Sequence, residues 1–404
     1  MSPLFSKLLD LRYYCLYGAA LLLPVTFFLG KSSRVSFFPT YIIALCVLSL
    51  VASHEIRQTV KQNRLSLGLL TLFLAYLALS NLRMDQSILS SALFLGYGLL
   101  ILCFVVSLSV LEQRFKGFFG VFMLIIIVSA CLSVCYAIYV FHALDYQPLD
   151  EPRLYALGGL YNPVVSALSY GAIAMLALSR YASTKDHHQK ILLGISIIIL
   201  LTGLIYTGTR SVWIGLFVAS FSLLYLLPDL STSRKRRILI ITQLCLIVVL
   251  VVLWKFGFHE EILRRSTSFR IEIWTEVLSS VFSGPYILGH GLNAEEVIKY
   301  QDYVFEHPHS IYLATLFYGG LLGLGLLMGF IGHLYWSWLK IEPKPYLIYA
   351  LPLMTYGLTC LLVDGDKLLT KVNFVWLLVW LPYAIALMHT VSLRENSRLR
   401  EAET

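Results

Sequence analysis

The sequence predicts an all-α integral membrane protein, and three observations lead to that prediction. Hydrophobic residues make up 58% of the 404 residues and charged residues only 13%, whereas a soluble domain usually carries about 25% charged residues. The mean hydropathy is +0.76. The apolar residues also gather in long runs, and in hydrocarbon a helix satisfies its own backbone polar groups. The solvent of this chain is therefore predicted to be lipid.

About twelve apolar segments are predicted to cross the membrane. A helix needs about 20 mostly apolar residues to cross the hydrocarbon core. The distribution of such segments divides the chain into three parts. Residues 1–254 hold nine predicted spans, residues 255–310 form the one long polar loop, and residues 311–404 hold three spans and a tail. The predicted spans are residues 13–30, 37–52, 66–80, 88–110, 117–141, 164–178, 191–206, 212–227, 238–254, 311–331, 346–363 and 374–388.

Lysines and arginines between the spans predict the orientation. They concentrate on one side, which includes the run from Arg234 to Arg237 and the C-terminal tail. Loops rich in Lys and Arg stay in the cytoplasm, so both termini are predicted to be cytoplasmic and residues 255–310 external, although Lys31 and Arg34 fall on the external side. The net charge of +8 fits this topology and anionic lipid headgroups better than a nucleic-acid partner.

The spacing of cysteines and histidines predicts no metal centre and no cofactor. All seven cysteines lie inside apolar runs, where we expect them to face lipid or to pack in the core. The segment His307-Pro308-His309 spaces two histidines as metal ligands can be spaced, but no acidic or cysteine cluster completes a site.

Arg210 is the first candidate for function. It lies in Thr207-Gly208-Thr209-Arg210-Ser211, between two apolar runs with almost no connector. The planar guanidinium pairs with phosphate oxygens through two parallel hydrogen bonds, so a cation held at the external membrane surface could bind a phosphate group. The alternative is an arginine that extends to the lipid headgroups.

A predicted amphipathic helix in the polar loop supplies the second candidate, Arg270. Ser268 is a plausible N-cap, which places Arg270 in the first turn of a helix at the membrane surface. An anionic ligand at this helix start would be favoured by the helix dipole; a solvated charged face is the alternative. The predicted apolar face consists of Ile271, Trp274, Val277 and Leu278.

Two further charges have open roles. Arg265 could reach the same anion as Arg270, or it could be an ordinary loop charge. Asp364 lies in a short external loop with Asp366, Lys367 and Lys371. It could orient an arginine or histidine of the site, and a plain polar turn is the alternative.

His309 is the candidate general base. It stands at the start of the tenth predicted span, after Pro308 and beside Ser310. A positioned neutral histidine accepts a proton efficiently near pH 7. The alternative is an interfacial histidine that makes a single hydrogen bond.

Glycines mark turns and close packing. Gly284-Pro285 and Gly289-His290-Gly291 predict tight turns, in a pattern that matches neither a P-loop nor a dinucleotide fingerprint, and His290 is interpreted as structural. The tenth predicted span contains five glycines within residues 319–329, which suits close helix packing.

Taken in order, these motifs resemble the bacterial O-antigen ligase family and its relatives, the O-antigen polymerases and membrane O-oligosaccharyltransferases. Thr-x-Thr-Arg-Ser at 207–211 is followed by the long external loop and by Phe-Arg-x-x-x-Trp at 269–274. Then come Pro-x-x-Leu-Gly-x-Gly-Leu at 285–292 and His-Ser-x-Tyr-Leu at 309–313. The signature covers roughly residues 207–325; elsewhere the resemblance rests on hydropathy and span number.

The resemblance implies a metal-independent glycosyltransferase of the Gram-negative inner membrane, with a GT-C-type membrane fold and a periplasmic active site. Such ligases take a glycan from undecaprenyl diphosphate and attach it to a sugar hydroxyl of lipid A–core in lipopolysaccharide assembly. Membrane lipid is then a further partner, and nucleic acid is not expected.

By the same resemblance, Arg210 and Arg270 match the family's diphosphate-binding arginines, and Arg265 matches a further loop arginine. His309 matches the histidine that activates the acceptor. Ser310 stands where relatives often have Asn, and both residue types can form local hydrogen bonds. Direct attack of the hydroxyl would invert the anomeric carbon, and no Asp/Glu pair points to a double displacement.

Three alternatives stay open. An O-antigen polymerase would share the carrier and leaving group but use another carrier-linked glycan as acceptor, and a protein O-glycosylating relative is also possible. A lipid-linked glycan flippase or transporter would show a similar number of spans, but it would be expected to carry cationic residues inside them. In this sequence the arginines lie at span ends.

Overall fold

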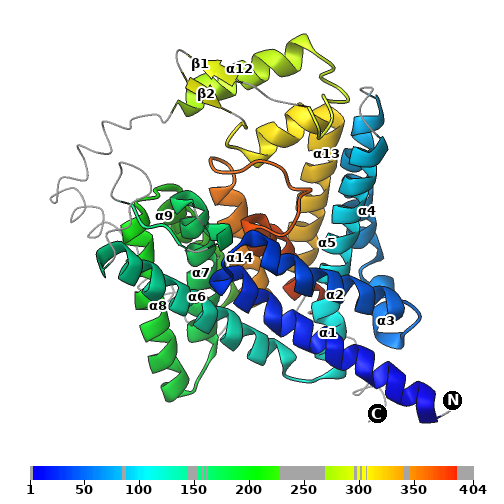
Figure 1. The fold of residues 1–404 in the computed structure, drawn as a ribbon, viewed down its shortest axis with the longest axis vertical. Coiled ribbons are helices and arrows are strands. Elements are labelled where there is room, and N and C mark those ends of the chain that lie inside the picture. Colours follow the sequence, from blue (N-terminus) through cyan, green and yellow to red (C-terminus); the bar gives the residue numbers. More distant parts are fainter. Residues whose placement is uncertain are drawn as a thin grey trace.

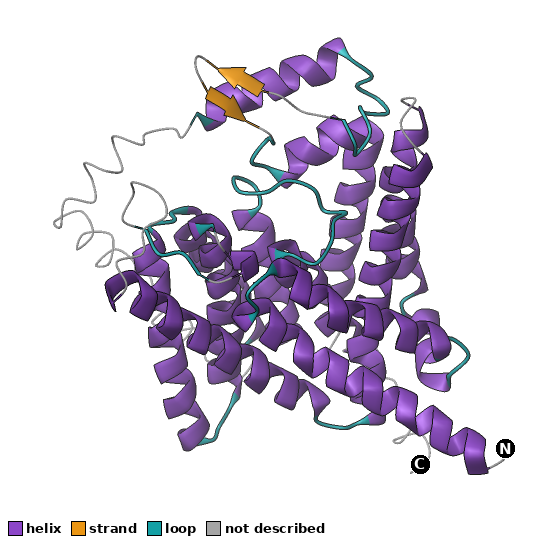
Figure 2. Ribbon diagram, viewed as in Figure 1, coloured by secondary structure: helices purple, strands orange, loops and turns teal. Residues whose placement is uncertain are grey.

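Helices make up nearly all of the regular structure (Figure 1, Figure 2). The computed structural model describes residues 3–83, 88–143, 153–156, 158–160, 162–227, 269–294, 298–300, 303–305, 307–340 and 346–388. The helices are α1 (Pro3–Leu29), α2 (Phe37–Ser49), α3 (His54–Gln62), α4 (Arg64–Leu79), α5 (Ile88–Arg114), α6 (Phe118–Ala143), α7 (Pro163–Ser183), α8 (His187–Thr207), α9 (Ser211–Leu226), α12 (Arg270–Ser283), α13 (Ile311–Lys340) and α14 (Leu347–Cys360).

Short elements complete this part of the chain. Three 3₁₀ turns cover Ser33–Ser36, Ser80–Arg83 and Gly158–Leu160, and a π-helical stretch covers Trp376–Trp380. Strands β1 (Ile298–Tyr300) and β2 (Tyr303–Phe305) pair antiparallel. With α12 they form a layer at one end of the bundle, beyond the start of α13 (Figure 1). At three residues each, the strands are too short for a sequence pattern to have predicted them.

Seven helices in the described part of the chain are long and apolar enough to cross a membrane, which makes this a multi-pass helical membrane protein. They coincide with seven of the twelve predicted spans. These helices are Asp10–Leu29, Arg64–Leu82, Ile88–Arg114, Phe118–Ala143, Pro163–Ser183, His187–Thr207 and Ile311–Lys340.

None of the other five predicted spans coincides with a single described helix that is long and apolar enough to cross a membrane. Residues 37–52 fall on α2, whose 13 residues extend only about 20 Å, and on the turn before α3, where the chain bends by 94°. The spans predicted at 212–227, 346–363 and 374–388 coincide with apolar helices of fewer than 18 residues. Residues 238–254 lie outside the described residues, so a total of twelve crossings stays a prediction.

Close helix contacts at the centre of the bundle position the C-terminal end of α14. A Cβ at Gly215 of α9 would collide with the Sγ atom of Cys360, and one at Gly171 of α7 would collide with the ring of Tyr356. Small residues at such contacts let helix backbones approach closely. As a result, the last residue of α14, Cys360, lies against the first residue of α9, with its Sγ 3.6 Å from the carbonyl oxygen of Ser211.

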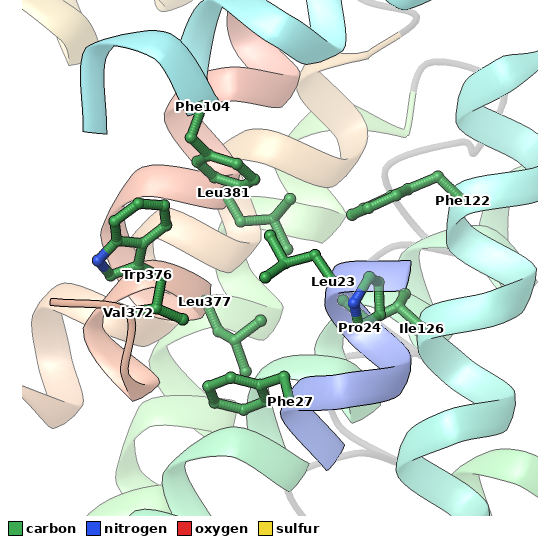
Figure 3. A pocket seen from close by; sticks show the side chains of 10 residues that line it. All are labelled: Leu23, Pro24, Phe27, Phe104, Phe122, Ile126, Val372, Trp376, Leu377 and Leu381. Carbon is green, nitrogen blue, oxygen red and sulfur yellow. The ribbon is translucent and has the colours of Figure 1, made fainter. Parts of the chain in front are cut away.

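A small apolar cavity lies in the same bundle (Figure 3). It measures about 30 Å³ and adjoins Pro24 inside α1 and Trp376 at the start of the π-helical stretch. Polar groups are absent from its lining, and the volume would admit no more than one or two water-sized molecules. It is a packing void where two irregular helices meet. The residues that line it are Leu23, Pro24, Phe27, Phe104, Phe122, Ile126, Val372, Trp376, Leu377 and Leu381.

Helix α13 is broken at Gly320, and the loop after α12 fills the break. Gly320 has φ 64° and ψ −168°. Beyond it, the amide of Leu321 donates to the carbonyl of Tyr286 (2.9 Å), and the amide of Leu322 donates to that of Ile287 (3.1 Å). The loop thereby supplies acceptors that an unbroken helix would have found within itself.

The same loop also donates to the upper part of α13. The amides of His290 and Gly291 bond the carbonyls of Phe317 and Tyr318, both at 2.9 Å. The ring of His290 stacks on that of Phe317, with the centroids 4.5 Å apart, a packing contact of the kind that a structural histidine makes.

The predicted close packing of the glycines holds for part of the set. A Cβ at Gly319 would lie 2.7 Å from Leu77 Cδ2 of α4, and one at Gly323 would lie 3.3 Å from Tyr76 Cε1. Gly325 and Gly329 have no atom within 4 Å of such a Cβ. Close packing against α4 is therefore confined to the part of α13 around the break.

Gly320→Ala is expected to loosen the loop from α13. The new methyl group would collide with the carbonyl of Ile287, and a positive φ is strained for alanine. We expect a loss of roughly 1–3 kcal/mol, measured as a lower thermal unfolding temperature in detergent. Gly325→Ala is the matched control and should leave that temperature unchanged or slightly raised. Equal behaviour of the two variants would contradict the described break.

Candidate functional site

The junction between α8 and α9 is held by an arginine from a distant loop. Gly208 ends α8 in the left-handed conformation, with φ 64°. Arg153 Nε donates to the carbonyl of Thr207 (2.8 Å), and its Nη2 donates to the hydroxyl of Thr209 (3.2 Å). Arg210 follows as the N-cap residue of α9, with an exposed side chain. The junction thus combines a hydrogen-bonded arginine, Arg153, with the exposed Arg210.

An ion pair connects the start of α12 to the chain just after α14. Arg270 is the first residue of α12. Its Nη2 donates to Asp364 Oδ1 at 2.6 Å and its Nε donates to the carbonyl of Val363 at 2.9 Å. The side chain of Asp364 is 5% exposed and that of Arg270 is 30% exposed. Such a charge-assisted pair orients the guanidinium.

Asp364 also links Arg270 to the α8–α9 junction. Burial raises the pKa of Asp364, while the cation of Arg270, the hydroxyl of Ser211 and the cation of Arg153 act in the opposite direction. The carboxylate therefore lies within electrostatic reach of both arginine-bearing segments. It also stands near the N-terminus of α12, where a negative charge is favourable.

The predicted apolar face of α12 was partly wrong. The buried stripe consists of Ile273, Val277 and Val281, which follow one another at a spacing of four residues. Ile271 is 63% exposed, because this stripe turns it away from the bundle. Trp274 and Leu278 flank the stripe and are half-buried.

The start of α12 also differs from the prediction. The N-cap position belongs to Phe269, which has a positive φ of 56° and makes no side-chain cap. Ser268, the predicted cap, lies outside the described residues. The predicted place of Arg270 in the first turn is confirmed.

His309 precedes α13 in an unusual backbone conformation. Its φ is 54°, in the left-handed region, which histidine and asparagine enter more readily than most residues. The neighbouring Pro308 is held in place because Trp274 Nε1 donates to its carbonyl at 3.1 Å. A strained backbone that is fixed by a neighbouring helix is common at functional sites.

The electrostatic surroundings keep His309 neutral. Burial lowers the pKa of His309 to about 4, and the nearby His307 and the cation of Arg270 act in the same direction. At pH 7 the imidazole therefore has a lone pair with which it can accept a proton. The side chain is half-buried.

The structure brings several predicted site residues together. Arg270, Asp364 and His309 interact directly or electrostatically, and Arg210 lies in the junction that reaches the same carboxylate through its neighbour Ser211. Ser310 is buried, and its carbonyl accepts the first hydrogen bond of α13, from Ala314. Arg265 lies outside the described residues.

Sequence reasoning missed Arg153. Its partners Thr207 and Thr209 lie more than 50 residues further along the chain. Arg153 is the single arginine of residues 144–162, and this isolated cation between two predicted spans is the signal that could have marked it.

Part of the chain is similar in sequence to known proteins. The O-antigen ligase family matches residues 195–328, a segment that contains Arg210, Arg270 and His309. This match covers 134 of the 404 residues. An O-antigen ligase of Pseudomonas aeruginosa is 32% identical over 243 residues, which is 60% of this chain and 57% of that relative. The match thus spans less than two thirds of the relative's length, and Arg153 and Asp364 lie outside the family match.

His309 is expected to titrate at about pH 4 in the folded protein. Unfolded histidine has a pKa of about 6.5, so between the two values the unfolded chain binds a proton that the folded chain does not. This difference lowers the free energy of unfolding as the pH falls from about 6.5 to 4. His309→Asn tolerates the same backbone and should remove that contribution, measured as unfolding temperature against pH. A histidine NMR titration with a midpoint above 6 would contradict the described environment.

Asp364→Ala is expected to release the start of α12. It leaves the half-buried guanidinium of Arg270 without its anion, and we expect a loss of roughly 2–3 kcal/mol together with faster hydrogen exchange in α12. The control is Asp10→Ala, which removes a solvent-exposed pair with Arg114 and should cost about 1 kcal/mol or less. Similar losses for both variants would show that the Asp364 pair does not anchor α12.

Proposed function

We propose that this protein is an O-antigen ligase that transfers a glycan from undecaprenyl diphosphate to a sugar hydroxyl of lipid A–core. The observation that carries the proposal is the placement of a neutral histidine, His309, within electrostatic reach of an oriented arginine, Arg270. A sugar hydroxyl needs a base, and a diphosphate leaving group needs positive charge. The two groups at this site meet these two needs.

The charge of the site favours a diphosphate. Arg153 and Arg270 act on the carboxylate of Asp364, and the exposed Arg210 is the N-cap residue of the adjoining helix α9. Arginine forks match phosphate oxygens in geometry and keep their charge at any working pH. We therefore assign the leaving group to Arg210 and Arg270, with Arg265 as a further candidate. Transfer would then need no metal ion.

His309 is assigned as the general base. In this mechanism it takes the proton of the acceptor hydroxyl while the hydroxyl oxygen attacks the anomeric carbon. The bond from that carbon to the diphosphate breaks, and its electron pair leaves with the phosphate. One displacement inverts the anomeric carbon, so the product linkage should have the opposite configuration to the donor. Ser310 and Asp364 hold the loop and the arginine in place.

The same proposal places the protein in the Gram-negative inner membrane. The layer that contains α12 would face the periplasm and both termini the cytoplasm, as the Lys and Arg distribution predicts. The GT-C-type fold belongs to this proposal; the helical bundle with its functional layer at one end is compatible with it.

Transfer should be measured in a reconstituted system with EDTA and without ATP. The wild type should move glycan from undecaprenyl diphosphate to lipid A–core with inversion, and His309→Asn should slow transfer by about 100-fold or more. His187→Asn, at the opposite end of α8, is the control and should retain the wild-type rate. Retention of configuration would exclude single displacement, and full activity of His309→Asn would remove His309 from the mechanism.

A gene deletion distinguishes this function from that of a polymerase. Loss of a ligase leaves bare core, whereas loss of a polymerase leaves core with one repeat unit in the lipopolysaccharide ladder. The purified wild type could instead fail to transfer glycan and move the lipid-linked donor from one leaflet of a vesicle membrane to the other. That result would identify the protein as a flippase and contradict the proposed enzyme activity.

A further inference from the structure

The loop after α14 packs directly on the segment that contains His309. The amide of Ile311 donates to the carbonyl of Leu361 at 3.0 Å. A Cβ at Gly365 would lie 2.6 Å from Ile311 Cγ2 and 3.3 Å from the backbone nitrogen of Ile311. Gly365 therefore allows close backbone contact, with one carboxylate on each side of it in the sequence, Asp364 and Asp366.

The two carboxylates have different partners. Asp364 is bound to Arg270 through a 2.6 Å hydrogen bond. The Oδ1 atom of Asp366, like the second carboxylate oxygen of Asp364, is buried and accepts no hydrogen bond from the residues that the structure describes. The ammonium of the neighbouring Lys367 lies over the ring of Tyr318, 4.4 Å from its centroid. A buried carboxylate oxygen without a donor is costly and is available for a further hydrogen bond.

His307 connects Asp366 to the candidate base. The ring centroids of His307 and His309 are 4.1 Å apart, with the ring planes inclined at 43°. Burial raises the pKa of Asp366, while Lys367 from its own loop, His307 from the segment before α13 and the hydroxyl of Tyr318 from α13 oppose this effect. His307 thus interacts with both Asp366 and His309.

Proton transfer creates a charge that needs an anion. When His309 accepts a proton, the imidazolium stands near the cation of Arg270 and beside His307. Asp364 is already paired with Arg270. Asp366 interacts with His307, the partner of His309 in this histidine pair.

We propose that Asp366 and His307 are positioning residues that fix the orientation and tautomer of His309 and offset the charge it gains. This inference rests on the proposed function. The proton moves from the acceptor hydroxyl to His309 as described above, the C–O bond to the acceptor forms, and the diphosphate leaves with the electron pair. His307 and Asp366 act through His309 and touch no substrate.

The first test compares Asp366→Asn and His307→Gln with wild type in the transfer reaction. We expect kcat to fall at least tenfold, with the KM for the donor within twofold of wild type. Removing the negative charge of Asp366 makes the imidazolium less favourable, so the acid limb of kcat/KM should move to lower pH in Asp366→Asn. Asp366→Glu should restore part of kcat. The control is Glu276→Gln, on the exposed face of α12, which should match wild type.

A second test does not depend on activity. In ¹⁵N-histidine-labelled protein in lipid nanodiscs at pH 7, the His309 signals, assigned with His309→Asn, should show one tautomer. Asp366→Asn and His307→Gln should show a mixture of tautomers. An unchanged tautomer together with unchanged kcat would overturn the proposal. A second outcome would also overturn it: Asp366→Asn loses activity, Asp366→Glu does not restore it, and the acid limb of kcat/KM does not move. That pattern is expected of a purely structural residue. Absence of transfer by the wild type would refute the ligase function, and the tautomer measurement would still decide the positioning role.

Discussion

A buried carboxylate just after α14 imposes the main constraint on the layer that contains α12. Asp364 is almost wholly shielded from solvent, and a buried charge is tolerated only when it is paired. Its pairing with Arg270 fixes the N-terminus of α12 over the chain that leaves α14. Because α14 packs closely on α9, the same contact sets the distance between α12 and the α8–α9 junction. The position of each arginine therefore depends on helix packing inside the bundle.

This arrangement explains how a membrane protein can keep several arginines close together before any ligand binds. Arg270 is partly neutralised by Asp364, and Arg153 is fixed by the oxygens of Thr207 and Thr209. Neither side chain has to be ordered when an anion arrives, which reduces the entropic cost of binding. The exposed Arg210 is the arginine whose side chain is best placed to adapt to the ligand.

Local patterns in the sequence predicted the long apolar helices, the polar layer and the place of Arg270 in the first turn of α12. These features depend on hydropathy and on helix-terminus signals, which are properties of neighbouring residues. The buried face of α12 was misjudged at Ile271, since the choice among adjacent faces is made by the surface on which the helix packs. Contacts such as Arg153 with Thr209, and Asp364 with Arg270, join residues 56 and 94 positions apart. The positive φ of His309 likewise reflects its contacts and is not marked by any local signal.

The break at Gly320 makes the attachment of the loop after α12 depend on how dry its surroundings are. The amides of Leu321 and Leu322 receive their acceptors from the loop at Tyr286 and Ile287. If that loop moved away in a dry environment, these amides would be left without partners at a cost of several kcal/mol each. In water they would be solvated at little cost. The loop should therefore be bound to α13 more strongly in a drier environment. A thinner bilayer or a more hydrated detergent micelle would release the loop from α13 without any change in the amino-acid sequence.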